Sequence, residues 1–391
     1  MEYIKRTWVE VSLDNLAHNY KEIRKKMPQN CRFLGVVKAD AYGHGAVPVS
    51  RSLESLGAEY LAVSDLEEAV QIRRGGIRLP ILILGYTPPE YAAFLAEQNF
   101  VQEINFLEYG YQLQQQLLGT GLRLKTHLKL DTGMSRLGFF AYDHPQTVED
   151  IKALSKLEHL VLEGVFAHFS VADSRQLDDV RYTRLQFERF QKMLDILQAE
   201  GITFSIRHHA NSAAMMQYPE YALDMVRSGI ATYGLFPSPA LRGSMDLRPV
   251  FSLHSAIAQI RQFDAGISVS YDRIYQTPSP RRIAVIPIGY ADGLMRRLSQ
   301  GVTVLLHGKR VPIVGRICMD MCMIDITDVP EAKVGDTVTL IGENEGAVSS
   351  CDSLADLAGT IPYEILCGIS KRVPRLYFQD GKQVDLLRYI V

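Results

Sequence analysis

Short apolar runs alternate with longer amphipathic stretches from residue 33 to about residue 230. The short runs have the length and the β-branched or aromatic content that are typical of buried strands. Eight of them are predicted to be strands: 33–37, 59–64, 80–84, 101–104, 125–130, 160–168, 203–209 and 223–227. Eight βα units in about 200 residues predict an α/β fold with a closed (β/α)8, TIM-like barrel, and an open doubly wound sheet is the alternative.

The stretches between these runs have the periodicity of helices. It is clearest in 176–200, where Phe190, Leu194 and Leu197 recur at intervals of three and four residues. A second stretch, 12–27, begins with residues suited to a helix N-cap and is predicted to be a helix that precedes the first barrel strand.

The pattern changes after about residue 235. Residues 236–249 are rich in Pro, Ser and Gly, as expected of a linker. Beyond the linker, β-like runs follow one another without long helices, except for one helical patch at 353–369. We therefore predict two domains, a barrel over 1–240 and a mainly-β domain over 241–391.

Composition narrows the possible partners and the compartment. Charged residues make up 22% of the 391 residues and the formal net charge is -2, so we expect no nucleic-acid partner. No apolar run reaches the length of about 18 residues that a membrane span needs, and the N-terminus lacks the pattern of a signal peptide.

Five cysteines without a paired framework fit a cytoplasmic protein. The single C-x3-C at Cys318 and Cys322 is interpreted as a strand with buried thiols, and we expect no metal site.

Ionisable residues follow the predicted strands at the ends where such barrels carry their active sites. Lys38 follows the first strand, Lys129 and Arg136 lie at and after the end of the fifth, and His168 ends the sixth, with Asp173 beyond it. Each of these residues taken alone has an ordinary structural explanation, such as a solvated lysine or a locally paired arginine. Their joint placement at successive strand ends favours a catalytic site.

The loops after the last two strands suggest what the site binds. Phosphate sites in such barrels commonly use these loops, and here Ser212 offers a hydroxyl while Gly229 and Ile230 offer backbone N–H groups. A phosphate cradle together with the strand-end amine of Lys38 suggests pyridoxal 5'-phosphate, whose aldehyde needs an amine and whose ring nitrogen needs a partner. Arg227 fits the role of that partner.

Several motifs together resemble the bacterial alanine racemase family. The segment VVKADAYGHG (36–45) is similar to the family's pyridoxal-lysine signature. The motifs KLDTGMSRLGF, AHFSVAD, HHANSAA, RSGIATYG, VSYDRIYQT, IGYADG, VGRICMDM and YEILCGISKRVPRLY resemble further blocks of the family in the same order. The resemblance runs from about residue 5 to about residue 378 and implies a barrel followed by a β domain.

The resemblance also implies roles for individual residues. Lys38 would hold the cofactor and act as the acid and base on one face of the substrate Cα, and Tyr271 would act on the other face. Arg227 would face the pyridine nitrogen, and His168 would bridge Tyr271 and Arg227. The phosphate would be held by Tyr42, Ser212, Gly229, Ile230 and Tyr363.

Further residues would serve the substrate. Arg136 would contact the substrate carboxylate, assisted by the backbone of Met319, and Asp320 would lie near the substrate. Lys129 matches a position often carbamylated in the family, where the new carboxylate would orient Arg136. Access to the site would be shaped by Asp173, Tyr290, Arg296 and Arg316.

The implied function is the interconversion of L-alanine and D-alanine, which supplies D-alanine for peptidoglycan. Tyr271 would come from a second subunit, so the implied assembly is a head-to-tail homodimer with shared active sites. A serine/alanine racemase of the same family and a non-catalytic pyridoxal phosphate-binding protein are the alternatives; a related decarboxylase is disfavoured because no triple-glycine loop is present. Asp272 departs from the glycine that is common after the tyrosine, and it could shift the loop that carries Tyr271.

Overall fold

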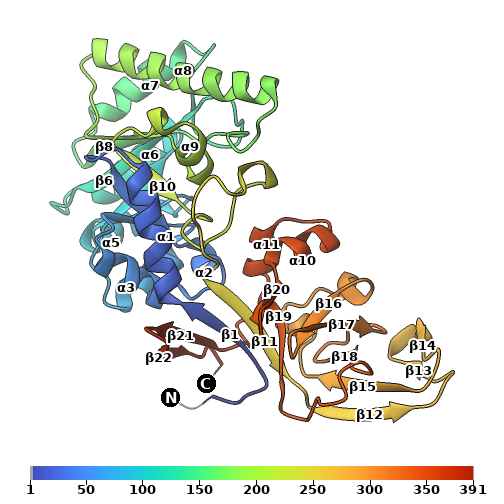
Figure 1. Ribbon diagram of the computed structural model, residues 1–391. Coiled ribbons are helices and arrows are strands. Elements are labelled where there is room, and N and C mark those ends of the chain that lie inside the picture. The colour runs from blue at the N-terminus through green and yellow to red at the C-terminus, as the bar shows by residue number, and fades with distance from the viewer. Residues whose placement is uncertain (1–2, 391) are drawn as a thin grey trace. The chain divides into compact units, whose positions relative to one another are not determined.

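The computed structural model describes residues 3–390 and contains two compact units, each described here by itself (Figure 1). The barrel unit comprises residues 17–41 and 46–248. The β unit comprises the residues up to 16, the short segment 42–45 and the residues from 249 onward. The chain therefore passes from the β unit to the barrel unit and back more than once.

Eight parallel strands form the barrel. Their order in the sheet is β10-β2-β3-β4-β5-β6-β8-β9, and a bridge between Asn211 and Arg227 joins the two ends of the row into a nearly closed barrel. The strands are β2 (Arg32–Val36), β3 (Tyr60–Val63), β4 (Ile81–Ile83), β5 (Phe100–Ile104), β6 (Leu124–Asp131), β8 (Leu160–Phe166), β9 (Ile206–His208) and β10 (Met225–Ser228), with the short β7 (Phe139–Phe140) beside β6. All eight strands predicted from the sequence are confirmed, and so is the barrel rather than the open sheet.

Burial on both faces explains why the apolar runs were visible in the sequence. Every residue of β3, β4 and β5 is buried, as expected where side chains on one face fill the barrel and those on the other meet helices. Two polar residues of β5, Gln102 and Glu103, are also buried. Consecutive residues of a strand point to opposite faces, and Glu103 is the one whose charge acts on Lys129 and Arg227. Buried polar groups need partners, so Glu103 marks a place where the barrel interior is not an ordinary apolar core.

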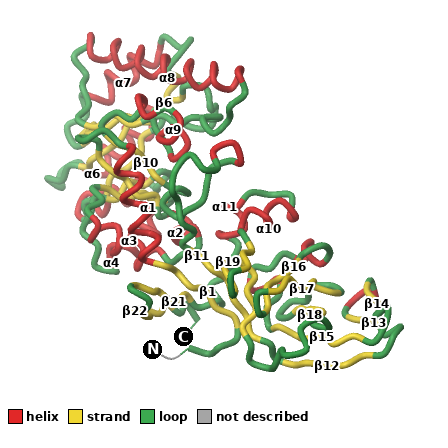
Figure 2. Tube along the Cα trace, in the orientation of Figure 1, coloured by secondary structure: helices red, strands yellow, loops and turns green. Residues whose placement is uncertain are grey.

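Helices surround the barrel strands, as the red and yellow segments of Figure 2 show. The two helices predicted from periodicity, 12–27 and 176–200, are confirmed as α1 and α8. The helices are α1 (Leu13–Lys26), α3 (Ala46–Leu56), α4 (Leu66–Arg74), α5 (Ala92–Glu97), α6 (Leu107–Leu117), α7 (Gln146–Ser155), α8 (Leu177–Ala199) and α9 (Ser212–Gln217), with the five-residue α2 (Lys38–Tyr42) after the first barrel strand. Within residues 3–390, none of the helices is long and apolar enough to cross a membrane.

The β unit is built on a second sheet, whose strand order is β12-β15-β18-β17-β16-β19-β11-β1-β21-β22, with β20 paired to β19. Its strands are β1 (Thr7–Ser12), β11 (Phe251–Ala256), β12 (Gln259–Phe263), β15 (Arg281–Ile286), β16 (Thr303–Leu306), β17 (Lys309–Val314), β18 (Cys322–Asp325), β19 (Thr337–Asn344), β20 (Ala347–Ser349), β21 (Arg375–Gln379) and β22 (Lys382–Leu387). A separate hairpin pairs β13 (Ser268–Val269) with β14 (Tyr275–Gln276). The predicted helical patch 353–369 is two helices, α10 (Cys351–Ala358) and α11 (Pro362–Cys367), because Gly359 turns left-handed with φ 63°.

The short segment 42–45 is fixed within the β unit by hydrogen bonds to β21. Arg375 Nε donates to the carbonyl of Gly43 at 3.1 Å, and the Tyr377 hydroxyl donates to the carbonyl of His44 at 2.8 Å. A Cβ on Gly43 would lie 2.3 Å from the carbonyl oxygen of Leu366, so only glycine fits at that position. These contacts set the position of the residue before them, Tyr42.

Arg375 gives a test of how much this anchoring contributes. Its side chain is 1% exposed and also donates to the carbonyls of Ile369, Ser370 and Val373. We expect Arg375→Met to lower the free energy of unfolding by about 3 kcal/mol or more, because several carbonyls lose a charged donor inside the core. Urea unfolding measures this loss. The matched variant Arg310→Met, at an exposed arginine, is expected to stay within about 0.5 kcal/mol of the wild type, and an equally small change in Arg375→Met would contradict the anchoring role.

Candidate active site

Lys38 begins a turn with an unusual backbone conformation. It follows β2, and the next three residues have left-handed φ angles of 51° at Ala39, 55° at Asp40 and 53° at Ala41. Tyr42 continues the turn with φ 54°. A left-handed conformation costs a residue with a Cβ about 1–2 kcal/mol, and such strain is concentrated at functional sites. The short helix α2 is thus a left-handed turn that starts at Lys38.

Hydrogen bonds from the barrel unit hold this turn. The backbone N–H of Ala39 donates to Glu68 Oε1 at 2.6 Å, and the second oxygen of Glu68 accepts from Ser64 N at 2.8 Å. Asp40 Oδ1 accepts from the N–H of Ala46, where α3 begins, at 2.8 Å. Burial raises the pKa of the Glu68 carboxyl, although its backbone hydrogen bonds oppose this effect. The turn at Lys38 is therefore fixed by carboxylates at both of its ends.

Lys129 lies in the barrel interior near the end of β6. Its Nζ lies 4.3 Å from the centre of the Phe166 ring, and its side chain is almost completely buried. Burial lowers the pKa of the Lys129 ammonium, and the nearby Glu103 carboxylate partly offsets this effect. Burial in turn raises the pKa of Glu103, which Lys129 opposes. The amine therefore loses its proton much more readily than a surface lysine does.

Arg136 lies in the loop that follows β6, and Asp131 organises this loop. Asp131 Oδ1 accepts from the backbone N–H of Gly133 at 2.8 Å and of Ser135 at 3.1 Å, while the Tyr182 hydroxyl donates to the carbonyl of Gly133 at 2.7 Å. Arg136 lines a pocket of about 320 Å³ whose apolar side chains are Phe106, Leu137 and Phe140. The loop presents a guanidinium beside an open apolar pocket, which suits a small anionic ligand.

Arg227 is a hub of hydrogen bonds in the barrel interior. It is 3% exposed, and its Nη2 donates to the carbonyls of Ala167 at 2.7 Å and His209 at 3.1 Å. Its Nη1 lies 2.9 Å from His208 Nδ1, and its Nη2 lies 3.2 Å from His168 Nδ1. Among the described residues its Nε has no hydrogen-bond partner. Burial lowers the pKa of Arg227 to about 9.

The contacts of Arg227 bear on two expectations from the sequence. His168 was expected to bridge Arg227 and Tyr271, and the structure places its Nδ1 against Arg227. The ordinary alternative for Arg227 was a local ion pair, but Asp224, the nearest acidic residue in the sequence, pairs with Arg207 instead, with an Nε to Oδ2 distance of 2.8 Å. Arg227 thus has acceptors but no carboxylate in direct contact among the described residues, and its Nε can donate to a ligand.

The two loops of the predicted phosphate cradle meet at the end of β10. Ser212 starts α9, and its Oγ accepts from the backbone N–H of Gly229 at 3.0 Å. Ser212 and Ile230 are both buried. Asp173, in the loop after β8, is partly buried, and its carbonyl accepts from the Ser238 hydroxyl at 2.6 Å. Small groups and backbone N–H groups are therefore concentrated where the sequence predicted them.

The other two residues of the predicted cradle belong to the β unit. The rings of Tyr42 and Tyr363 lie with their centres 5.8 Å apart, tilted by 50°. Burial raises the pKa of Tyr42, which therefore remains a neutral hydrogen-bond donor near neutral pH. The five expected phosphate ligands thus form two groups, one in each unit.

Tyr271 lies in the β unit on the short 3₁₀ helix Tyr271–Arg273, and it is 64% exposed. The Asp272 carboxylate next to it accepts from Arg316 Nε at 3.0 Å and from Arg296 Nη2 at 3.4 Å. Asp272 has φ 60°, a value at which glycine is the more usual residue. Asp272 therefore keeps the left-handed backbone that glycine would favour. Its carboxylate also connects the Tyr271 loop to Arg316 and Arg296, the two arginines that were expected near the access to the site.

Met319 and Asp320 lie in the same unit, beside Tyr290. The carbonyl of Met319 accepts from Ala291 N at 2.9 Å, and Tyr290 N donates to the carbonyl of Cys318 at 3.0 Å. Asp320 Oδ1 accepts from Arg372 Nη1 at 2.8 Å. The side chains of Met319 and Tyr290 are 54% and 41% exposed, so a surface for a ligand or a partner is available here.

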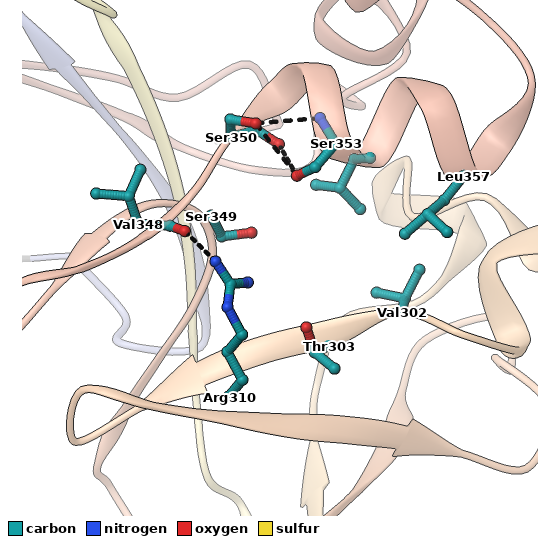
Figure 3. Close-up of a pocket in the computed structure, with 9 residues that line it drawn as sticks. Val302, Thr303, Arg310, Val348, Ser349, Ser350, Ser353 and Leu357 are labelled. Atoms are coloured by element: carbon teal, nitrogen blue, oxygen red, sulfur yellow. Dashed lines mark hydrogen bonds between the residues drawn. The ribbon is translucent and has the colours of Figure 1, made fainter.

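A larger pocket in the β unit contains none of the predicted site residues. Its volume is about 420 Å³, and Figure 3 shows Arg310 pointing toward the Val348 carbonyl to which it donates. The Ser350 hydroxyl accepts from Ser353 N at 3.1 Å at the start of α10. Arg310, Ser350 and Ser353 are thus hydrogen-bonded within the protein, and this pocket contributes no residue to the candidate site.

Sequence reasoning missed several residues of the barrel interior. Glu68 holds the Lys38 turn, Glu103 lies beside Lys129, and His127 and His208 are 2.9 Å apart between Nδ1 and Nε2. For Glu103, His127 and His208 the available signal was a charged or imidazole side chain inside a strand run, whereas Glu68 lies on α4 and had no such signal. A barrel buries both faces of its strands, so a polar residue at such a position must lie inside the protein.

The sequence matches two family profiles and several full-length relatives. The profiles, described as alanine racemase N-terminal domain and C-terminal domain, match residues 11–237 and 250–377. Alanine racemase 2 of Caldanaerobacter subterraneus subsp. tengcongensis is 43% identical over 387 residues, which are 99% of this chain and 98% of that protein. The solved structure of an alanine racemase from Clostridium difficile 630 has a TM-score of 0.95 at 39% identity, and 100% of each chain is covered. That of the alanine racemase from Bacillus anthracis with bound L-Ala-P has a TM-score of 0.94 at 38% identity, with 100% of this chain and 99% of that chain covered.

Four buried imidazoles predict acid sensitivity of the barrel unit. Burial lowers the pKa values of His127, His168, His208 and His209. Below about pH 6.5 the unfolded chain binds protons that the folded chain resists, so stability falls as the pH falls, by up to about 1.4 kcal/mol per pH unit for each imidazole. Urea unfolding at about pH 7.5 and about pH 5.5 measures this loss.

A variant separates this effect from other acid effects. The His209 ring stacks on Phe169 with centres 3.7 Å apart, and neither of its nitrogens has a hydrogen-bond partner among the described residues. His209→Phe should therefore fold and show a shallower loss of stability with acid. Equal stability of the wild type at the two pH values would contradict the prediction.

Proposed function

The chain belongs to the alanine racemase family and acts as an alanine racemase, and we propose that it does so with two bases, Lys38 and Tyr271, on opposite faces of the substrate. Racemisation removes the Cα proton from one face and returns a proton to the other, so it needs two groups that handle protons. The observation that carries the assignment of Lys38 is its place at the start of a strained left-handed turn beside a barrel strand. Such strain needs extensive support, which Glu68 and Asp40 supply.

We propose pyridoxal 5'-phosphate as the cofactor, because the described residues fit its three polar parts. Lys38 supplies an amine for the aldehyde, the loops of Ser212 and Gly229 supply donors for the phosphate, and the unpartnered Nε of Arg227 suits the ring nitrogen. Tyr42 and Tyr363 would complete the phosphate site. When bound, the cofactor withdraws electrons from the substrate Cα and so makes its proton removable.

Each side chain of the proposed site would have its own role in proton transfer or in binding. Lys38 Nζ would take or return the proton on one face, and Tyr271 Oη would do so on the other. Arg136 would hold the substrate carboxylate with the backbone of Met319, while Asp320 would lie near it. Arg227 would keep a positive charge at the ring nitrogen, and His168 would connect it to Tyr271.

We propose that the active sites are shared in a head-to-tail homodimer. Tyr271 and Met319 are largely exposed on the β unit, and exposed apolar side chains surround the pocket of Arg136. Exposed aromatic and apolar groups next to functional residues support a surface that another chain covers. In such a dimer Tyr271 would serve the barrel of the partner, and Arg296, Arg316, Tyr290 and Asp173 would shape the access.

The proposed role is the supply of D-alanine for peptidoglycan in the cytoplasm. Serine differs from alanine by one hydroxyl, which apolar contacts reject by only about a hundredfold. We therefore expect alanine to be preferred and serine to be a slower substrate. A non-catalytic pyridoxal phosphate-binding protein is the second candidate considered from the sequence. It is disfavoured because this chain matches both domain profiles and aligns with a full-length alanine racemase over 98% of that protein.

The two-base assignment predicts the kinetics of two variants. Lys38→Ala and Tyr271→Ala should each lower the rate of D-alanine formation from L-alanine by at least about 10²-fold, the usual contribution of general acid–base catalysis. A coupled assay for D-alanine and D-serine measures the rates on both substrates. Arg310→Met is the matched control and should keep full activity. Full activity in either Lys38→Ala or Tyr271→Ala would refute the assignment.

We further propose that Lys129 is carbamylated and that the new carboxylate orients Arg136. Burial keeps much of the amine unprotonated, which is the form that adds carbon dioxide. Protein equilibrated with ¹³C-labelled bicarbonate should show one carbamate signal by ¹³C NMR, and Lys129→Ala should lose it. Lys129→Ala should also raise KM for alanine by about tenfold. A wild-type protein without the signal would exclude the modification.

A further inference from the structure

A chain of polar contacts crosses the barrel interior from Arg227 to Glu163. Arg227 Nη1 lies 2.9 Å from His208 Nδ1, and His208 Nε2 lies 2.9 Å from His127 Nδ1. His127 Nε2 has no hydrogen bond among the described residues, and Glu163 Oε2 faces it at 3.6 Å. Both imidazoles are 0% exposed. Four side chains from β10, β9, β6 and β8 therefore connect in one line.

The chemistry of Arg227, the first residue of this line, fixes the direction in which hydrogen bonds are donated along it. A guanidinium has donors only, so His208 must accept through Nδ1 and carry its proton on Nε2. That proton can only point to His127 Nδ1, which accepts it, and His127 then carries its own proton on Nε2. The last N–H is directed at the Glu163 carboxylate. All three links thus run from Arg227 toward Glu163.

The protonation states of the two imidazoles and of the Glu163 carboxylate agree with this direction. Burial, and then the charge of Arg227, holds the pKa of His208 well below its usual value. Burial also lowers the pKa of His127, so both rings are neutral near neutral pH. The contact with His127 is the first cause that lowers the pKa of Glu163, to about 2. Glu103 is the carboxylate whose charge acts on Arg227, but burial raises its own pKa, whereas the pKa of Glu163 is lowered, so Glu163 is the more firmly ionised of the two.

The fold makes room for the last link of the line. In the pairing of β6 with β8, Thr126 opposes Leu162 and His127 opposes Gly164, so Glu163 is an extra, unpaired residue. Such a bulge re-aims the side chain that it carries. A Cβ on Gly164 would lie 2.6 Å from His127 Nε2, so glycine is required for the ring to fit.

The carboxylate itself is held at the opposite end of the strands from the catalytic loops. The Tyr60 hydroxyl, on the first residue of β3, donates to Glu163 Oε2 at 2.8 Å. Lys125, on the second residue of β6, is paired with Oε1 at 3.0 Å and is 42% exposed. Arg227 is the third residue of the four in β10, near the carboxyl ends of the strands. The line therefore joins the two ends of the barrel.

We propose that Glu163 is a positioning residue for the racemase, which holds Arg227 through His127 and His208 so that Nε remains the donor for the cofactor. The inference rests on the proposed function only for the role of Nε. Without the carboxylate at residue 163, the buried N–H of His127 loses the negative charge that faces it at 3.6 Å, and the line that fixes Nη1 of Arg227 loses its end.

The first arm of the test uses the protein without any assay of activity. In ¹⁵N-histidine-labelled wild-type protein, NMR should show His127 and His208 neutral and protonated on Nε2. Glu163→Ala should increase the exchange rate of the His127 N–H with water by at least about tenfold, because the carboxylate that faces and covers this N–H is lost. Glu163→Gln, which keeps an acceptor oxygen, should restore most of the protection. Tyr60→Phe is the matched control, since it removes one bond to the same oxygen and leaves the carboxylate in place, and it should match the wild type.

The second arm measures the racemase with its cofactor bound. Glu163→Ala should lower kcat by about 10-fold to 100-fold with a smaller change in KM, the range seen when a residue behind a site-forming residue is removed, and Glu163→Gln should recover most of kcat. Protonation of either imidazole on Nδ1 in the wild type, or wild-type exchange and kcat in Glu163→Ala, would overturn the proposal. If the NMR results hold but the wild type forms no D-alanine, the line stands and the proposed function fails instead.

Discussion

A racemase must handle protons on both faces of one carbon, and this chain carries the two proposed bases in two separately folded units. Each base lies on a strained backbone that a carboxylate supports. Glu68 accepts from the left-handed turn that begins at Lys38, and Asp272, itself at φ 60°, binds Arg316 beside Tyr271. Strain of this kind persists only where the surroundings over-determine it. The large sheets of both units supply that support and leave the loops to carry the chemistry.

Positive charge governs the chemistry of the barrel interior. Arg227 and Arg136, together with Lys129 in its protonated form, act on His168, whose pKa is held well below its usual value, first by burial and then by these charges. The Glu103 carboxylate partly offsets the effect of burial on the pKa of Lys129. It acts on Arg227 only through its charge, because no direct contact between the two is found among the described residues. An interior with excess positive charge and few anions favours ligands that bring their own, such as a phosphate and a carboxylate. The same charge keeps the imidazoles neutral, so they orient Arg227 without adding to the repulsion.

The sequence predicted the parts of this molecule that depend on local pattern. All eight barrel strands were visible because strands buried on both faces are apolar runs. The pairing of β1 with β11 and β21 could not be predicted. Both partner strands lie more than 230 residues away, and the pattern of apolar residues in a strand does not show which other strand it pairs with. The anchoring of Gly43 by Arg375 was missed for the same reason.

The residues of the candidate site likewise fall into those that local sequence pattern predicted and those that it could not predict. Lys38, Lys129 and His168 could be selected as candidate site residues from their positions at the ends of predicted strands, because such barrels carry their active sites there. The roles of Tyr271 and Met319 came only from the family resemblance, as no local pattern connects a loop of a β domain with a barrel. The line to Glu163 was missed because its direction depends on hydrogen-bond geometry between residues from four strands.

The claim that two chains share each active site is tested most directly by mixing two inactive variants. Lys38→Ala and Tyr271→Ala chains are produced separately, dissociated and reassociated together, and the D-alanine formed from L-alanine is measured. If the sites are shared, each heterodimer contains one site with both native bases and so has about half the activity of the wild-type dimer. Random reassociation of equal amounts makes about half of the dimers heterodimers, and the activity of the mixture should therefore rise toward about a quarter of the wild-type value. If the mixture stays as inactive as its parents while heterodimers are shown to form, each site is built within one chain and the account is wrong.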